Sequence, residues 1–216
     1  MEITWYGHSC FRLTERGLAT IVTDPYDNSI GYDSARLKAD IVTVSHDAPG
    51  HNNVEAVKGA RPITGPGEYE IGGVFITGIA THRPEKKKKD GENGSKNTLY
   101  LFDFDGLTVA HLGDLDHVPT QAQIEDLGTV AVALVPVGGG GGLNAAQAAE
   151  VISLIEPSIV VPMHYKTPEV TLKLEPLNKF LKEMGLSTVK TEESLTVKKT
   201  SLPEETHVVV LDYKRS

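Results

Sequence analysis

The sequence has little cysteine and no long apolar run. Its 216 residues include one cysteine, Cys10, so no disulfide can form within the chain. No apolar run approaches the ~18 residues that a membrane-spanning helix needs. The first residues follow a strand pattern, without the basic and then apolar segments of a secretion signal. We therefore expect no membrane partner and a cytoplasmic protein with a buried, inert Cys10 thiol.

Basic residues are also in the minority. The chain has 21 Lys and Arg against 29 Asp and Glu, a net charge of -8. Nucleic-acid binding needs clustered positive charge, so a nucleic-acid partner is not expected. The one basic cluster, Lys86–Lys89, is interpreted as a solvated loop tip. The alternative is a lid that attracts an anionic substrate toward His82.

Hydrophobic periodicity predicts an α/β protein. Short apolar or alternating stretches predict strands, and Ala148, Val151, Ile152 and Ile155 share one face of a helix that Asn144 would cap. Both halves repeat strands, helix, strands, which favours one domain, residues 1–216, of two packed sheets with helices outside. The predicted strands are 2–6, 10–14, 18–23, 40–44, 61–64, 68–71, 74–80, 98–104, 107–111, 130–137, 158–162, 188–197 and 207–212, and the predicted helices are 52–58, 120–127, 144–155 and 175–184. Residues 83–96 are expected to form a flexible excursion.

Several candidate metal ligands stand just after predicted strands. The segment Ser45-His46-Asp47-Ala48-Pro49-Gly50-His51 brings two histidines to the end of one strand. Later strand ends carry His82, Asp114 in His111-Leu112-Gly113-Asp114, and His164. Imidazoles and a carboxylate on a rigid frame are the ligands of zinc-type sites.

The order of these segments resembles the metallo-β-lactamase superfamily, whose signature is HxHxDH followed by a distant His, an Asp and a final His. The opening Ile3–Phe11, the turn Thr23-Asp24-Pro25 and the segment Pro162-Met163-His164-Tyr165 are similar to the branch of ascorbate-6-phosphate lactonase-like and other metal-dependent hydrolases. The resemblance implies a four-layer αββα sandwich. Ala48 stands at the second His of the signature, and Gly50 stands at its Asp.

The resemblance also implies the metal ligands. His46 and His82 would remain for a first metal, His51 and His164 for a second, and Asp114 would bridge them. Each half-site lacks one protein ligand, so we expect fewer than two tightly held ions per chain. Such ligands accept Zn²⁺, Mn²⁺ or Fe²⁺.

Neighbouring residues receive supporting roles. His111 and His117 flank Asp114 and are predicted to orient ligands or to donate a proton to the leaving group. His8 and Asp24 are expected to line or brace the site without binding metal. Asp47 is expected to point away, and His207 to lie on the surface. The run Gly138–Gly142 predicts either a flexible turn or a close backbone approach to an anion.

Two functions remain open. In the first, a metal-bound hydroxide hydrolyses an ester, lactone or phosphoester of a small, anionic substrate. In the second, the loss of two signature positions leaves a non-enzymatic protein that binds an acidic metabolite. Substrate, metal and oligomeric state are not determined by the sequence, because a fold does not choose among them.

Overall fold

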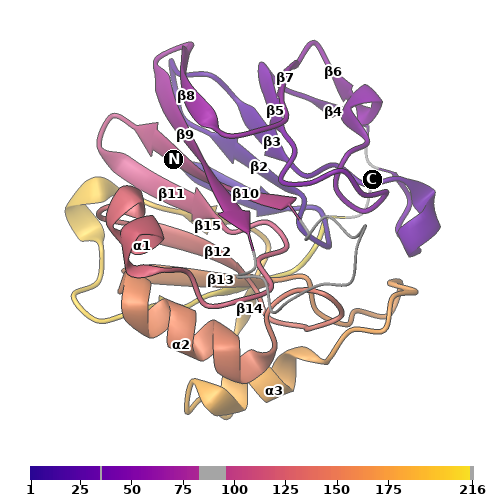
Figure 1. The fold of residues 1–216 in the computed structure, drawn as a ribbon, viewed down its shortest axis with the longest axis vertical. Helices are drawn as coiled ribbons and strands as arrows, with labels where there is room; N and C mark the ends of the chain where they lie inside the picture. The colour runs from indigo at the N-terminus through magenta and orange to yellow at the C-terminus, as the bar shows by residue number, and fades with distance from the viewer. Residues whose placement is uncertain (35, 83–95, 215–216) are drawn as a thin grey trace.

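Two β-sheets pack face to face in the computed structural model, which describes residues 1–34, 36–82 and 96–214, without the side chain of His82 (Figure 1). The first sheet has the order β15-β1-β2-β3-β5-β7 and the second the order β16-β13-β12-β11-β10-β9-β8. The first comprises β1 Glu2–Trp5, β2 Phe11–Thr14, β3 Ile21–Thr23, β5 Ile41–Thr43, β7 Arg61–Ile63 and β15 Leu195–Thr196. The second comprises β8 Gly67–Ile71, β9 Val74–His82, β10 Lys96–Phe104, β11 Leu107–His111, β12 Val132–Pro136, β13 Ile159–Met163 and β16 His207–Val208.

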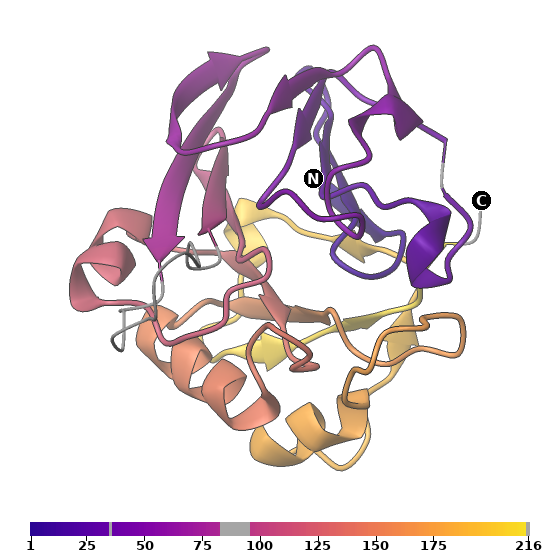
Figure 2. The ribbon, with the colours of Figure 1, turned by 45° about the vertical axis from the view of Figure 1, so that its right-hand side comes forward.

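Three α-helices lie along the second sheet, on the side away from the first sheet (Figures 1 and 2). They are α1 Gln121–Leu127, α2 Ala145–Ile155 and α3 Leu177–Glu183. Both α1 and α2 begin with a capping box, in which Thr120 and Asn144 accept a hydrogen bond from a backbone N–H of the first turn. The predicted cap at Asn144 is therefore confirmed. Helix α2 buries its predicted apolar face against the sheet, where β12 and β13 are buried on both faces.

The first sheet is also covered on both faces, because its side chains alternate between two cores. Trp5 and Ile21 face the core between the sheets, whereas Tyr6 and Val22 face an outer core. In the described chain, loops and 3₁₀ turns rather than an α-helix close that outer core. They include η1 Asn28–Ile30, η2 Val54–Ala56 and the small sheet of β4 Leu37–Lys38 with β6 Val57–Lys58. The predicted pair of packed sheets is confirmed, with this outer layer built from loops.

Some predicted elements were wrong. The helix expected at 52–58 is a 3₁₀ turn followed by β6, because Val57 and Lys58 pair with β4 instead of continuing a helix. The strand expected at 188–197 is divided into β14 Thr191–Glu192 and β15, which belong to different sheets. The strand expected at 207–212 likewise divides into β16 and β17 Val210–Leu211. Residues 83–95 of the expected excursion, which include its run of lysines, lie outside the described residues.

Strand direction brings distant loops to one edge of the sandwich. Strands β1, β3 and β5 run in the same direction, since β2 is antiparallel to β1 and β3, and β3 is parallel to β5. Strands β11, β12 and β13 are also parallel. A backbone hydrogen bond of 3.1 Å from His164 N to His8 O joins the loops after β13 and β1. The ends of both parallel sets therefore meet. No α-helix within the described ranges is long and apolar enough to cross a membrane.

Candidate metal centre

Three buried histidines form the centre of the site where these strand ends meet. His8 follows β1, His51 closes the loop after β5, and His164 directly follows β13. Their exposed fractions are 1%, 3% and 3%. One ring nitrogen from each lies within 4.8 Å of the others. Ring centroids are 4.7 Å apart for His8 and His51, and 4.2 Å apart for His8 and His164.

A second group overlaps the first through His51. His46, His51 and Asp114 also offer ligand atoms within 4.8 Å of one another. Asp114 lies between the two groups, with Oδ2 3.9 Å from His46 Nε2 and Oδ1 3.4 Å from His164 Nε2. The structure thus brings together four of the five predicted ligands, namely His46, His51, Asp114 and His164, and adds His8.

The remaining predicted positions are placed as follows. His82 ends β9 and pairs with Lys96, and its side chain lies outside the described residues. Asp47 is exposed and accepts a hydrogen bond from Asn52, so it points away from the site as expected. Cys10 is free and buried, in agreement with the expectation of an inert thiol.

Asp24 and Ser45 fix the orientation of His46. Asp24 is fully buried, and it accepts hydrogen bonds from Ser45 N at 2.7 Å and from Ser45 Oγ at 2.6 Å. The same Oγ lies 3.1 Å from His46 Nδ1. When Asp24 is ionised, this chain places the proton of neutral His46 on Nδ1 and leaves Nε2 free to face Asp114. Burial raises the pKa of Asp24 to about 8, against the opposing effect of the two Ser45 bonds, so this tautomer of His46 is the one expected above that pH.

The backbone is strained where it carries the site. Outside glycine, positive φ occurs at five described residues, and three of them are His8 at 51°, Asp24 at 38° and His164 at 53°. Left-handed conformations are disfavoured for residues with a side chain and persist where surrounding contacts impose them. For His8 the contacts are the hydrogen bonds that its carbonyl oxygen accepts from His164 N and Trp5 Nε1, both 3.1 Å.

Burial also keeps the imidazoles neutral. It lowers the pKa of His8 and His51 well below the usual value, and neighbouring histidines lower both further. Burial lowers the pKa of His46 as well, although Asp114 opposes the shift. A metal binds the neutral form of imidazole, so His8, His46 and His51 are in the binding-competent state at neutral pH.

The two predicted catalytic histidines differ in geometry. His111 is fully buried, with Nε2 2.9 Å from Ser9 O and Nδ1 accepting from Gly113 N at 3.2 Å. Both ring nitrogens are therefore engaged with backbone, and a proton-donor role for His111 has no support here. His117 lies beside Asp116, with Nδ1 2.6 Å from Oδ1, and its Nε2 is buried without a hydrogen bond to another described group.

Sequence reasoning missed two residues of the site. His8 was expected only to line it, although a histidine between Gly7 and Ser9 at a strand end is the same signal that identified His46 and His164. Asn97 of β10 accepts from Asp114 N at 3.0 Å and donates to Leu112 O at 3.1 Å. Asn97 therefore fixes the turn that carries Asp114. The sequence does not indicate this role, because a polar residue within a strand is not distinguished from any other.

The glycine run packs against Asp114. A Cβ atom on Gly142 would lie 2.5 Å from Asp114 Oδ1, and one on Gly141 3.6 Å from Oδ2. The anion that the run approaches is therefore the Asp114 carboxylate. The start of α2 is occupied by its own capping box, since Asn144 Oδ1 accepts from Gln147 N at 3.0 Å.

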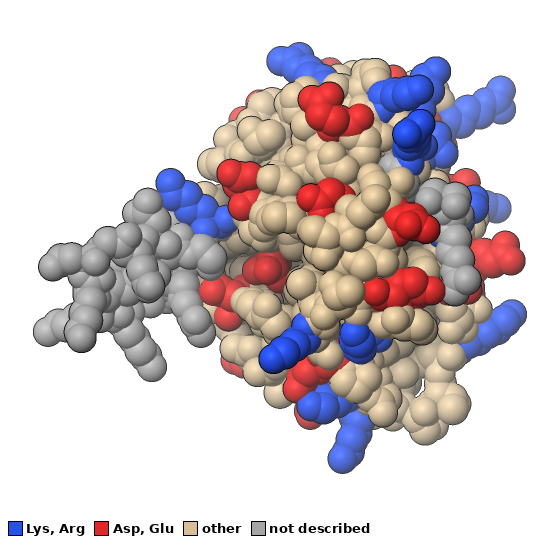
Figure 3. All heavy atoms as spheres, turned by 90° about the vertical axis from the view of Figure 1, so that its right-hand side faces the viewer, with Lys and Arg blue, Asp and Glu red and all other residues tan. Residues whose placement is uncertain are grey.

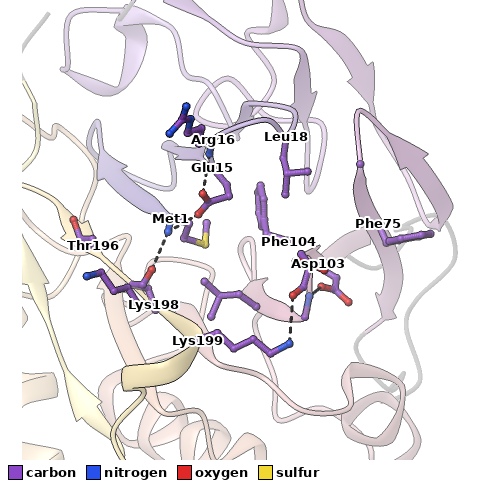
Figure 4. A pocket seen from close by; sticks show the side chains of 15 residues that line it. Met1, Glu15, Arg16, Leu18, Phe75, Asp103, Phe104, Thr196, Lys198 and Lys199 are labelled. Atoms are coloured by element: carbon purple, nitrogen blue, oxygen red, sulfur yellow. Dashed lines mark hydrogen bonds and ion pairs between the residues drawn. The ribbon is translucent and has the colours of Figure 1, made fainter.

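A large hollow of about 800 Å³ lies away from the histidines. It is formed between the turns that follow β2, β10 and β15, at the ends of these strands opposite the candidate metal centre (Figure 4). It contains none of the site residues. Two of its charged side chains have local partners: Glu15 pairs with the Met1 amino group, and Lys199 donates to Asp105 O. On the face shown in Figure 3, basic and acidic side chains are interspersed, without one continuous basic patch over the described residues.

Unsatisfied nitrogens make the histidine cluster fit a metal ion. Both ring nitrogens of His8 and of His51, and Nδ1 of His164, are buried without a hydrogen-bond partner among the described residues. Buried polar atoms are normally paired, because leaving one unpaired costs about 1–3 kcal/mol. Three adjacent imidazoles with free lone pairs form the type of ligand set that zinc binds, with a fourth position open.

Comparisons with known proteins agree with this geometry. Residues 2–164 match the family profile of the β-lactamase superfamily domain. A Thermotoga maritima structure, named as a Zn-dependent hydrolase of the metallo-β-lactamase superfamily, is similar over 97% of both chains, with 39% identity and a TM-score of 0.78.

Curated relatives are similar along most of their length. A UPF0173 protein of Pyrococcus furiosus is 30% identical, in an alignment that covers 77% of this chain and 84% of the relative. A UPF0173 metal-dependent hydrolase of Archaeoglobus fulgidus is 28% identical, in an alignment that covers 86% of this chain and 93% of the relative.

Proposed function

The chain belongs to the metallo-β-lactamase superfamily, and on this premise we propose that it is a metal-dependent hydrolase of a small anionic ester, lactone or phosphoester. One observation carries the proposal. Buried, neutral imidazoles with free nitrogens lie beside Asp114 at the converging strand ends. Relatives named metal-dependent hydrolases support the same reaction class.

His46, His51, Asp114 and His164 would hold the metal, with His82 as a further proposed ligand. A bound divalent ion lowers the pKa of its water from about 15.7 to about 7 and polarises the substrate oxygen. We propose one tightly held ion per chain, because the two ligand groups share His51. Zn²⁺, Mn²⁺ and Fe²⁺ all suit imidazole and carboxylate ligands.

The chain's own residues position the reacting groups. Asp24 and Ser45 hold His46 with Nε2 toward Asp114. Asn97 fixes the turn of Asp114. His117, oriented through Nδ1 by Asp116, is proposed to donate a proton from Nε2 to the leaving oxygen.

Charge supports an anionic small molecule as substrate. Histidine binds a metal in its neutral form, so a divalent ion held by histidines and one carboxylate keeps about one unit of positive charge. An anionic group on the substrate would complete that balance. The net charge of -8 opposes binding to nucleic acid, which we do not propose as a partner.

The test combines metal analysis with a hydrolysis screen. The protein is loaded with Zn²⁺ or Mn²⁺, dialysed, and assayed on p-nitrophenyl esters, lactones and bis(p-nitrophenyl) phosphate. We expect one retained ion and turnover that His164→Ala abolishes, while His207→Ala, an exposed histidine of β16, keeps both. If metal-loaded protein turns over none of these substrates but binds acidic metabolites, the non-enzymatic alternative replaces this proposal.

A further inference from the structure

His8 lies where a side chain at position 50 would project. A Cβ atom on Gly50 would lie 2.9 Å from His8 Nε2 and 3.2 Å from His8 Cδ2. Gly50 does not have positive φ, so its backbone conformation does not require glycine. Glycine is required at position 50 because the His8 ring occupies the space that a side chain would need.

Position 50 is also where the HxHxDH signature has its Asp. We infer that His8 replaces that acidic ligand and joins His51 and His164 as a third histidine ligand of the metal centre. This inference rests on the proposed function, because it assigns a ligand of the same metal centre.

The environment of His8 favours a ligand over a structural histidine. A buried structural histidine is expected to pair its ring nitrogens, as His111 does with Ser9 O and Gly113 N. His8 pairs neither, although it is as deeply buried. Instead its ring packs against those of His51 and His164.

The backbone of His8 is held at the cost of an unfavourable conformation. Its φ of 51° is maintained by the two hydrogen bonds to its carbonyl oxygen, one of them from His164 N. His164, with a φ of 53°, is strained in the same way. The bond between their backbones fixes the spacing of two rings that approach from different sheets. Strain that positions two imidazoles with unpaired ring nitrogens is typical of a functional site.

A ligand exchange tests the inference through metal retention rather than activity. The proteins compared are wild type, His8→Asn, Gly50→Asp, the double variant, and His207→Asn as a surface control. Asn tolerates left-handed φ, so His8→Asn preserves the turn. Each is loaded with Zn²⁺, dialysed and analysed for metal. Circular dichroism checks folding, and the visible spectrum of bound Co²⁺ reports the ligand set.

We expect wild type and His207→Asn to retain one ion. Loss of a supporting partner costs about 10–100-fold in metal affinity, so loss of the His8 ligand should raise the Kd by at least ~100-fold. Gly50→Asp alone should retain less metal than wild type, since the new side chain meets the His8 ring. The double variant should regain retention, with a changed Co²⁺ spectrum.

Full retention by His8→Asn, or increased retention by Gly50→Asp alone, would overturn the inference. A second measurement requires no variant. In ¹⁵N NMR of the histidine rings of wild type, Zn²⁺ should shift His8, His51 and His164 together and leave His207 unchanged, and an unshifted His8 would also overturn it. If His8→Asn loses metal but wild type hydrolyses no substrate, the proposed function fails and this inference stands. If His8→Asn retains metal and wild type hydrolyses a substrate, this inference fails and the proposed function stands.

Discussion

Oδ1 of Asp114 lies 3.4 Å from Nε2 of His164, and its other oxygen faces His46 Nε2 at 3.9 Å. This carboxylate belongs to the group of His46, His51 and Asp114, and through Oδ1 it also lies beside His164 of the other group. Asp114→Asn keeps its size and removes its charge. We expect turnover to fall by at least ~100-fold and metal affinity to fall with it, because an anionic ligand is lost. Steady-state kinetics and elemental analysis measure both, and unchanged values would remove Asp114 from the centre.

Gly142 leaves room for this carboxylate. Gly142→Ala would place a Cβ 2.5 Å from Oδ1 and displace Asp114, so we expect metal affinity to fall at least ~10-fold with the fold retained. Gly65→Ala is the matched control, since a Cβ there meets nothing within 4 Å. Neither glycine has positive φ, so backbone strain does not separate the two variants. Equal metal affinity in both would show that the glycine run is only a flexible turn.

His111 makes the fold sensitive to acid. Burial lowers the pKa of His111 to about 4, although its bond to Ser9 O opposes the shift. Between about pH 4 and 6.5 the unfolded chain takes up a proton there that the native protein does not, so stability falls as pH is lowered through this window. The contribution is at most on the order of 3 kcal/mol.

The measurement is urea unfolding of wild type and His111→Gln at a series of pH values. The variant should be less stable than wild type at pH 7 and should lose less stability on acidification. Because the other titrating groups are present in both proteins, the difference between the two curves isolates His111. Parallel curves would contradict this assignment.

Cys10 is expected to be unreactive in the native protein. Its thiol is free and almost fully buried, and burial raises its pKa, with a further contribution from Asp24. Since the thiolate is the reactive form, an aromatic disulfide reagent should modify it only after unfolding in guanidinium. Rapid labelling of the folded protein at pH 8 would show that the loop after β1 opens readily.

The sequence determined those parts of the site that are local. His46 and His51 belong to one loop, and Asp114 and His164 each follow an apolar strand, so strand patterns and loop residues were enough to find them. Asn144 and Gln147 similarly define the start of α2 through contacts within one turn. Contacts between residues close in sequence form whenever their helix or turn forms, so they can be predicted without the tertiary structure.

Only the tertiary structure determined the role of His8 and the outer layer of the first sheet. His8 is more than 40 residues from His51 and more than 150 from His164, and no periodicity shows which strand ends become neighbours. The segment predicted as a helix at 52–58 instead pairs β6 with β4, because Asn53 and Val57 find partners in Tyr26 and the outer core. Long-range packing decides such cases, since a short segment has too weak a helical preference to resist it.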